Sequence, residues 1–425
     1  MKITKQERSW ILYDWANSVY ATIMMAAVVP IYFSTIAEAA GQEGDSWWSV
    51  ATTIAMLLTA FGAPLIGAFA DYWGYKKKLF VIFLTVGLSF TAFSAITVNW
   101  VGLMIGYIVS HMAFNAGNLV YDSFLPDVTT RDRMDKISAY GFALGYIGGS
   151  TIPFIVSIIL IQFGDKIGLT GTLPVQISIG IAVVWWLLFS IPFLKNVKQI
   201  HGIDKPKTGI VEETFMNAIK TAIKIFKDKK VFYFVLAYFF YIDGVGTVIT
   251  MSTAYGATLK LDATGMILAL LVTQLVAFPC SIIFGNIARK IGSLKMITVA
   301  IIIYLAVCIV GFIMGFGLEE KWFGTETALI LFWILAFMVG TVQGGIQALS
   351  RSYFGKIIPP ENAGEYFGFF DIFGKFAAII GPFLYFIAKT VTGRSSFAIL
   401  SLVVLFLIAL MVMTIGKKHF GSEQE

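Results

Sequence analysis

The sequence predicts an all-α, multi-pass membrane protein with twelve transmembrane helices arranged as two pseudo-symmetric halves of six. The first observation is composition: of 425 residues, 58% are hydrophobic and only 13% are charged, against about 25% charged residues in a soluble domain. The second is a set of twelve long apolar runs, and the third is a loop motif that occurs once in each half. The first apolar run is too long for a cleaved signal peptide, so we expect it to remain as the first span.

The twelve spans follow from length and hydrophobicity. A helix needs roughly 20 apolar residues to cross the hydrocarbon core of a bilayer. The runs that meet this requirement are Ile11–Ala37, Trp48–Ala70, Leu79–Val98, Val101–Leu125, Ile137–Phe163, Leu173–Leu194, Val231–Leu259, Thr264–Ile287, Met296–Leu318, Thr327–Phe354, Gly364–Ile387 and Ser396–Gly416.

The distribution of basic residues predicts the orientation. Of the 31 lysines and arginines, 25 fall at the N-terminus, the C-terminus or in the loops on one side, whereas the opposite loops hold five. Loops rich in lysine and arginine stay in the cytoplasm, so we expect both termini and the central linker there. The tryptophans at the other ends of the spans fit an aromatic belt at the outer interface; they are Trp47, Trp48, Trp100 and Trp322.

A glycine- and charge-rich loop joins spans two and three and recurs in weaker form after span eight. The segments Gly67–Leu79 and Gly285–Lys295 both follow the pattern G-x-x-A-(D/R)-x-x-G-x-x-K. Together with the long polar stretch in the middle, they divide the chain into a first half at residues 1–194, a linker at 195–230 and a second half at 231–425. Both halves begin on the same side, so the repeat is parallel, as in facilitator-type transporters.

These features resemble a known family. The first loop resembles the signature loop of the major facilitator superfamily. The segments Tyr13–Tyr20, Phe124–Asp127, Gly141–Gly149 and Gln347–Tyr353 resemble the branch that contains the autophagy-related fungal vacuolar amino-acid effluxer and its bacterial relatives. The resemblance implies the twelve-helix facilitator fold, alternating access and amino-acid export. The short loops indicate a prokaryotic protein, hence a multi-pass protein of the cytoplasmic membrane that we expect to be a monomer.

The resemblance also implies a gate on the cytoplasmic side. In the superfamily, the acid of the signature loop belongs to a charge network that keeps the inside closed in the outward-open state. By resemblance, Asp71 and Lys76 would form this gate with Asp127 and Arg131 at the end of span four. The second loop carries Arg289 in place of the acid, so its own gating role is either absent or reversed in charge.

The second part of the linker predicts an amphipathic helix. Phe215, Ile219, Ala222, Ile223 and Phe226 share one helical face, and three lysines lie off it. Two alternatives remain open: a basic helix on the inner membrane surface, or a solvated helix packed on the rest of the protein.

Ionisable residues inside the spans are candidates for function. Such residues are expensive in a bilayer and face a bundle interior or a wet cavity. Spans three, six, nine and twelve carry none, which matches the facilitator fold, where these helices face lipid. The candidates for proton coupling are Asp243, Asp371 and Asp122, with Asp243 preferred because it lies near the middle of span seven. The alternatives are a hydrogen bond of Asp243 to a neighbouring helix and a structural Asp371–Lys375 ion pair at i, i+4.

Polar residues at similar depth predict the substrate site, since transporters bind substrate near the midplane. An amino acid would suit them, with Lys375 facing a carboxylate and Asp243 an amine; a sugar, peptide or organic anion remains open. The amides could instead join helices. The candidate substrate-binding residues are Tyr13, Asn17, Asn115, Asn118, Gln274, Gln343, Gln347 and Lys375.

Other classes of protein are disfavoured. Three histidines and two cysteines in apolar runs offer no nucleophile–base pair or metal site, so we expect neither an enzyme nor a cofactor. No nucleotide-binding G-x-x-x-x-G-K-(S/T) motif occurs, and the basic residues fit membrane topology better than nucleic-acid binding. The partners expected are therefore a small solute, a proton or other ion, and the bilayer. The alternatives kept open are a flippase for lysolipids or other amphiphiles, and a receptor that transports nothing.

Overall fold

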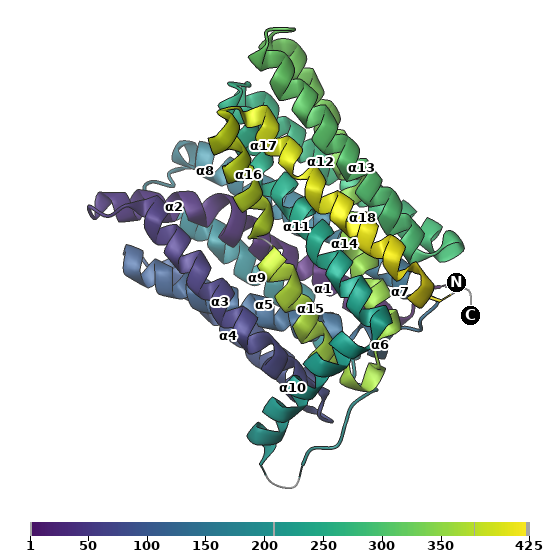
Figure 1. The fold of residues 1–425 in the computed structure, drawn as a ribbon. Coiled ribbons are helices and arrows are strands. Elements are labelled where there is room, and N and C mark those ends of the chain that lie inside the picture. Colours follow the sequence, from purple (N-terminus) through teal and green to yellow (C-terminus); the bar gives the residue numbers. More distant parts are fainter. Residues whose placement is uncertain (1, 207–208, 378, 422–425) are drawn as a thin grey trace. The chain divides into compact units, whose positions relative to one another are not determined.

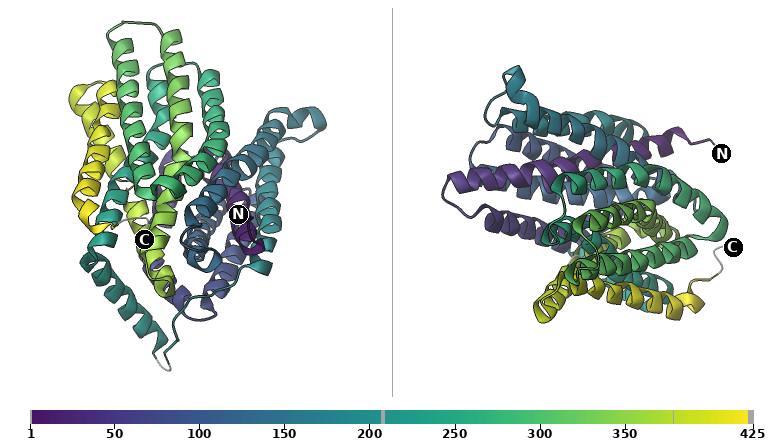
Figure 2. Two further views of the ribbon diagram at one scale, coloured as in Figure 1. Left: turned by 90° about the vertical axis from the view of Figure 1, so that its right-hand side faces the viewer. Right: turned by 90° about the horizontal axis from the view of Figure 1, so that it is seen from above.

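The computed structural model describes residues 2–206, 209–377 and 379–421, and these residues form helices joined by short loops (Figures 1 and 2). The other positions of the three predicted regions lie outside the described residues: 1 in the first half, 207–208 in the linker, and 378 and 422–425 in the second half. Within the described part of the chain, twelve helical segments are long and apolar enough to cross a membrane. Each overlaps one predicted run, so the prediction of twelve spans is confirmed.

The first six spans are built from the following elements, with α for α-helices and η for π- or 3₁₀-helical segments. They are α1 (Lys5–Tyr20), η1 (Ala21–Ala27), α2 (Val28–Ala39), α3 (Gly44–Asp71), α4 (Tyr75–Ile96), α5 (Trp100–Ser123), α6 (Leu125–Val128), α7 (Met134–Leu144), η2 (Gly145–Thr151), α8 (Ile152–Phe163), η3 (Gly164–Ile167) and α9 (Leu173–Asn196).

The linker helix and the last six spans complete the chain. Their elements are α10 (Ile210–Lys227), α11 (Lys229–Thr258), α12 (Ala263–Ile291), α13 (Ser293–Glu319), α14 (Thr325–Ile357), η4 (Pro360–Asn362), α15 (Ala363–Ala377), α16 (Ile380–Thr392), α17 (Ser395–Ser401), α18 (Val403–Gly416) and η5 (Lys417–His419).

Four spans are not the uniform α-helices that the apolar runs suggest. The first and fifth spans contain the π-helical turns η1 and η2, the eleventh consists of the helices α15 and α16, and the twelfth of α17 and α18. Glycines explain the fifth span, because a Cβ atom at Gly148 would lie 2.0 Å from the ring of Trp15 and one at Gly149 would lie 2.3 Å from the Cβ of Ser18. The segment Gly145–Gly149 therefore makes a close helix contact, and it comes with a widened helical turn of the kind often found at functional sites.

The chain folds into two compact units. Unit 1 comprises residues 1–130, 144–220 and 359–369, and unit 2 comprises residues 131–143, 221–358 and 370–425. Each unit therefore includes a short segment from the other half of the sequence. Unit 1 contains the start of span eleven, and unit 2 contains the start of span five.

Each unit has its own packed interior. In unit 1, α1 packs on α9 and α5 packs on α3 and α4. An aromatic cluster fills the space between them, with Trp10 stacked on Tyr121 at a centroid distance of 4.5 Å and Tyr13 set against Phe80 and Phe193. In unit 2, α14 packs on α12 and α13, and α11 packs on α18.

The linker helix α10 has three distinct faces. The residues that it buries are Thr214, Ala218, Thr221 and Ile225. The predicted apolar face is mostly exposed instead, with 56% of Phe215, 42% of Ile219, 48% of Ile223 and 62% of Phe226 accessible. The apolar face is thus not the face that packs on protein.

Candidate functional site

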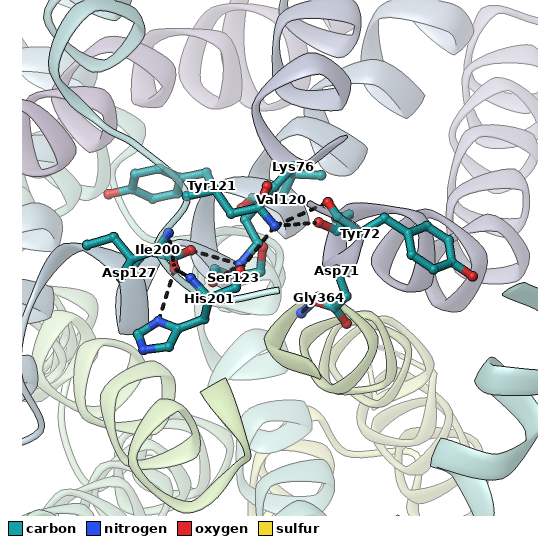
Figure 3. A network of polar contacts seen from close by, with 12 residues as sticks. Asp71, Tyr72, Lys76, Val120, Tyr121, Ser123, Asp127, Ile200, His201 and Gly364 are labelled. Atoms are coloured by element: carbon teal, nitrogen blue, oxygen red, sulfur yellow. Dashed lines mark hydrogen bonds and ion pairs between the residues drawn. The ribbon is translucent and has the colours of Figure 1, made fainter. Parts of the chain in front are cut away.

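The first loop motif is bonded to the start of the eleventh span (Figure 3). The carboxylate of Asp71, fully buried at the end of α3, accepts hydrogen bonds from the backbone amides of Gly364 at 2.6 Å and Glu365 at 2.8 Å. These amides belong to the first turn of α15, where N–H groups lack partners within the helix. A carboxylate there is also favoured by the positive end of the helix dipole. Asp71 therefore caps α15, and it does so from the opposite half of the sequence.

A buried ion pair lies beside this cap. Lys76, in the first turn of α4, places its Nζ 2.8 Å from Oδ2 of Asp127, and both side chains are fully buried. The Lys76 Nζ also donates to the carbonyl of Ser123 at 3.3 Å and lies 5.4 Å from the centroid of the Phe124 ring. A buried ion pair is stable only where further hydrogen bonds satisfy both charges.

The start of the linker supplies the remaining donors. The backbone amides of Ile200 and His201 donate to Oδ1 of Asp127 at 2.8 and 2.7 Å, and Nδ1 of His201 lies 3.1 Å from the same oxygen (Figure 3). The segment then runs along the loop motif, where the Ile203 amide donates to the carbonyl of Asp71 at 2.8 Å. The Trp73 amide donates to the carbonyl of Ile203 at 3.1 Å.

Residues 199–203 thus form a strap over the loop. The amide side chain of Gln199 completes it: Nε2 donates to the carbonyl of Tyr72 at 3.2 Å, and Oε1 accepts from the amide of Gly74 at 3.0 Å. Sequence reasoning treated this stretch as linker. Composition could not have revealed the strap, because most of its bonds involve backbone groups.

The glycines of the two loop copies have the same tasks. The first glycine permits close approach: a Cβ at Gly67 would lie 2.1 Å from the carbonyl oxygen of Gly364, and one at Gly285 would lie 2.4 Å from the Cβ of Ala139. The second glycine has a positive φ angle, 78° at Gly74 and 101° at Gly292, which side chains with a Cβ seldom adopt. The match of the two copies in sequence therefore reflects equivalent backbone geometry.

The second copy is accompanied by a polar cluster around Asp135. This carboxylate accepts from the Ser293 hydroxyl at 3.0 Å, from the Ser352 hydroxyl at 2.6 Å and from Nζ of Lys356 at 2.5 Å. Nearby, Nε of Arg351 donates to the Ser138 hydroxyl at 2.9 Å. In unit 2 the acid thus comes from the start of span five and not from the loop.

The four predicted gate residues are divided between the units. Lys76 and Asp127 pair directly, and Asp71 lies in the same unit. Arg131 belongs to unit 2 and is exposed. Arg289, which replaces the acid in the second loop, is also exposed. Sequence reasoning missed Asp135, although the short spacing of charges in Arg131–Lys136 was a signal available to it.

The predicted substrate residues of unit 1 lie on α1 and α5. Asn17 and Asn118 are hydrogen-bonded to each other, with Nδ2 of Asn17 donating to Oδ1 of Asn118 at 2.7 Å. Tyr13 is fully buried in the aromatic cluster, and its hydroxyl accepts from Nε1 of Trp186 at 3.4 Å. Nδ2 of Asn115 is buried with no hydrogen-bond partner among the described residues.

The carboxylate of Asp243 lies at the break in the eleventh span. Its two oxygens accept from the backbone amide of Gly381 at 3.0 and 2.9 Å, and the Thr247 hydroxyl lies 3.4 Å from Oδ1. Gly381 is the second residue of α16, so Asp243 caps a helix that begins within the span. A Cβ at Gly381 would lie 2.0 Å from the hydroxyl of Thr247, and glycine is therefore required for this approach.

The other predicted residues of unit 2 fall into two groups. Asp371 and Lys375 form an ion pair one turn apart on α15. Gln274 and the buried Gln343 line a small cavity of about 80 Å³ between α11, α12, α13 and α14, with Thr273 and Ser252 also in its wall. Gln347 lies one turn farther along α14 and is half-buried, and Asp122 is half-buried in the last turn of α5.

The described residues contain no group of three or more His, Cys, Asp or Glu side chains arranged to hold a metal ion. Cys280 is half-buried and Cys308 is buried, and both are free thiols.

The fold is that of the major facilitator superfamily. The outward conformation of the transporter FucP aligns with a TM-score of 0.69 at 14% identity, covering 97% of each chain. The proton:xylose symporter XylE aligns with a TM-score of 0.69 at 12% identity over 97% of this chain and 94% of that one. At such low identity the likeness concerns the fold alone. The likeness to these structures gives the fold class, and the match in sequence to a family of transporters gives the class of protein, which is a transporter rather than an enzyme.

Sequence comparison places the chain more narrowly. A family model described as "Vacuole effluxer Atg22 like" matches residues 43–424, and the chain belongs to this family. The MFS-type transporter YxiO of Bacillus subtilis (strain 168) is 43% identical over 429 residues, covering 99% of this chain and 97% of that protein. Autophagy-related protein 22 of Cryptococcus neoformans is 25% identical over 303 residues, or 69% of this chain and 51% of the fungal protein.

Proposed function

We propose that the protein is a secondary active transporter that moves a small polar solute, with an amino acid as the candidate, by alternating access coupled to proton movement. Membership of a family described as effluxers supports transport as the activity. The observation that carries the coupling proposal is the bond between Asp243 and the amide of Gly381.

The geometry at Asp243 offers a way to link a proton to helix movement. Interrupted membrane helices expose backbone groups at ion and substrate sites of transporters. An ionised carboxylate bonds strongly to the N-terminal amide of α16, because both the charge and the helix dipole favour the contact. A proton on Asp243 removes that charge and weakens the contact. Protonation and release of α16 from α11 would then be one event.

The solute is proposed from the polar groups in each unit. In unit 1, Asn115 offers an unused amide donor, and in unit 2, Gln274 and Gln343 line a cavity. Lys375 could meet the carboxylate of an amino acid only by exchanging its partner Asp371. We therefore expect Lys375 to take part when a solute displaces this ion pair.

Gating is proposed for the two loop regions. In unit 1, Asp71 holds the start of α15, and in unit 2, Asp135 ties the start of span five to α13 and α14. Each contact joins residues from different halves of the sequence. We propose that both lie at the cytoplasmic ends of the spans and separate when the transporter opens to that side.

The location follows from the same reasoning. The excess of lysine and arginine on one side supports cytoplasmic termini, and a bacterial relative at 43% identity supports the cytoplasmic membrane. We expect the transporter to act as a monomer.

The test begins with a thermal-shift screen of the purified protein against amino acids, sugars, nucleosides and lysolipids, because a specific ligand stabilises the native state. Proteoliposomes are then assayed for uptake of the selected solute under a pH gradient and for exchange without a gradient. Asp243→Asn should abolish gradient-driven uptake and leave exchange intact. Asp165→Asn, in an exposed loop, is the matched control. Gradient-driven uptake by Asp243→Asn at the normal rate would refute the coupling role.

A further inference from the structure

A large open cavity of about 1050 Å³ lies at the lysine- and arginine-rich end of unit 2. Its wall consists of the segment before α7, the end of α12, the start of α13 and the ends of α14 and α18. None of the predicted substrate residues lines it. The cavity is lined by seven cationic side chains and two acidic ones, which are Arg131, Lys230, Arg289, Lys290, Lys295, Lys356, Lys417, Asp132 and Asp135.

The buried acid in this cavity is already satisfied. The side chain of Asp135 is only 2% exposed and bonds to Ser293, Ser352 and Lys356. It therefore neutralises Lys356, and with Asp132 also counted the lining keeps an excess of five positive charges.

Six of the cations carry no ion pair within the described residues, and they come from four parts of unit 2. They are Arg131, Lys230, Arg289, Lys290, Lys295 and Lys417. Like charges gathered around one cavity repel one another, so an anion bound among them would relieve that repulsion. The lining also includes Gly292, Ser293 and Leu294 at the N-terminus of the 27-residue helix α13, which adds partial positive charge to the same space.

The rest of the lining is largely apolar, with the hydroxyl side chains of Thr298, Tyr353 and Thr414 as exceptions. Ile291 and Leu294 flank the loop, and Leu410 and Met413 belong to the last two turns of α18. A basic pocket between membrane helices on the cytoplasmic side is the kind of site that holds phospholipid headgroups. The size of the cavity also exceeds what inorganic phosphate alone would fill.

We propose that this cavity is a binding site for a phosphate-bearing anion, separate from the transported solute. The phosphate would lie among Arg289, Lys290 and Lys295, beside the N-terminus of α13. Two sources share this chemistry, namely the headgroup of an anionic phospholipid and a soluble phosphate compound. Binding to either would tie the segment before α7 to the loop between α12 and α13.

The experiment measures ligand-induced thermal stabilisation of the purified full-length protein in a neutral detergent. The probes are dioctanoyl phosphatidylglycerol, dioctanoyl phosphatidylcholine as the zwitterionic control, glycerol phosphate and inorganic phosphate. The test variant carries Arg289→Gln, Lys290→Gln and Lys295→Gln, three exposed positions. The matched control carries Lys5→Gln, Lys198→Gln and Lys205→Gln, which removes the same charge from exposed positions outside the cavity.

We expect saturable stabilisation by an anionic probe, with an apparent Kd at least about tenfold weaker in the test variant and unchanged in the control variant. Stabilisation by phosphatidylglycerol alone would identify a lipid headgroup, and stabilisation by glycerol phosphate as well would identify a soluble phosphate. If no anionic probe exceeds phosphatidylcholine, or if both variants lose affinity equally, the site does not exist. Lys295→Glu alone should act in the same direction and replaces the triple variant if that variant is unstable. The measurement requires no transport, so its outcome is independent of the proposed transport function.

Discussion

At the scale of single residues, carboxylates in this protein act mainly on backbone amides. Asp71 caps α15, Asp243 caps α16, and Asp127 accepts from two linker amides as well as from Lys76. All three carboxylates are buried, and in such a setting charge-assisted hydrogen bonds are strong and a missing partner is costly. The three acids therefore fix where helices and segments meet, and a change in their charge would release those contacts.

The buried pair of Lys76 and Asp127 gives a first prediction at this scale. Lys76→Met leaves the buried carboxylate of Asp127 without its counter-charge. Asp127→Leu leaves the buried ammonium of Lys76 without its counter-charge and two linker amides without an acceptor. Each single variant should destabilise the protein by about 3–5 kcal/mol. The double variant should lose less free energy of unfolding than the two single variants lose in sum. Thermal unfolding in detergent measures all three variants, and additive losses would show that the two residues do not act as a pair.

Asp71 gives a second prediction. Asp71→Ala leaves the amides of Gly364 and Glu365 without their acceptor, at a cost of about 1–3 kcal/mol. Loss of this cap should let α15 move away from α3. The variant Ala63→Cys reports on this movement, because α3 contacts Gly368 of α15 at that position. The background carries Cys280→Ser and Cys308→Ser, so that the introduced cysteine is the one that is labelled. We expect a polar maleimide to label position 63 about tenfold faster in Asp71→Ala. The control Asp204→Ala, at an exposed linker position, should label at the original rate, and an equal rate in Asp71→Ala would contradict the cap's role.

At the scale of elements, the interruptions within the membrane helices are the features most relevant to bending and ligand binding. The π-helical turn η2 in span five lies against α1 in span one through Gly145, Gly148 and Gly149, which contact Trp15 and Ser18. The eleventh span is divided, and its second helix begins at the amide bonded to Asp243. Such irregular turns are where membrane helices bend and where their backbone groups become available to a ligand.

The linker helix α10 gives a prediction at the scale of elements. Its exposed apolar face lies next to the lysines on the same helix, and this arrangement suits a helix on a bilayer surface. In nanodiscs, a fluorophore on Ile223→Cys should be quenched by a nitroxide placed on the lipid chain. The same fluorophore on Lys224→Cys should be quenched much less. Equal quenching at the two positions would favour the alternative of a solvated linker helix.

At the scale of the whole molecule, each compact unit contains a segment from the other half of the sequence. Residues 359–369 belong to unit 1 and residues 131–143 belong to unit 2. The exchange is reciprocal. Residues 359–369 lead into the fifth span of the second half and contact Gly67, and residues 131–143 lead into the fifth span of the first half and contact Gly285. The repeat in the sequence thus corresponds to a repeat in contacts.

This exchange predicts that the halves depend on each other. Residues 1–205 expressed alone lack the segment that covers Gly67 and Asp71, so this half should be less stable than the full chain. Co-expression with residues 206–425 supplies the segment and should restore stability and co-purification. Limited proteolysis and thermal unfolding of the three preparations provide the measurement. A first half as stable alone as in the co-expressed pair would show that the exchange contributes nothing.

The amino-acid sequence by itself determined the fold class, the twelve spans and the family. These follow from apolar runs as long as a bilayer is thick and from local motifs such as Tyr13–Tyr20, which need no knowledge of distant contacts. It also identified Asp243, because a charge within a span is costly wherever it points, and resemblance to the superfamily identified Asp71, Lys76 and Asp127.

Only the tertiary structure decided which group each charge meets. Asp71 binds backbone amides nearly 300 positions away along the chain, at Gly364 and Glu365, and backbone amides have no residue-specific signature in a sequence. For the same reason the strap at residues 199–203 could not be predicted. A hydrogen bond of Asp243 to a neighbouring helix was one of the alternatives, but its partner, the Gly381 amide of α16, could not be specified. The gathering of cations at the end of unit 2 depends on which helix ends of that unit are brought together in space, and spacing along the chain does not specify that.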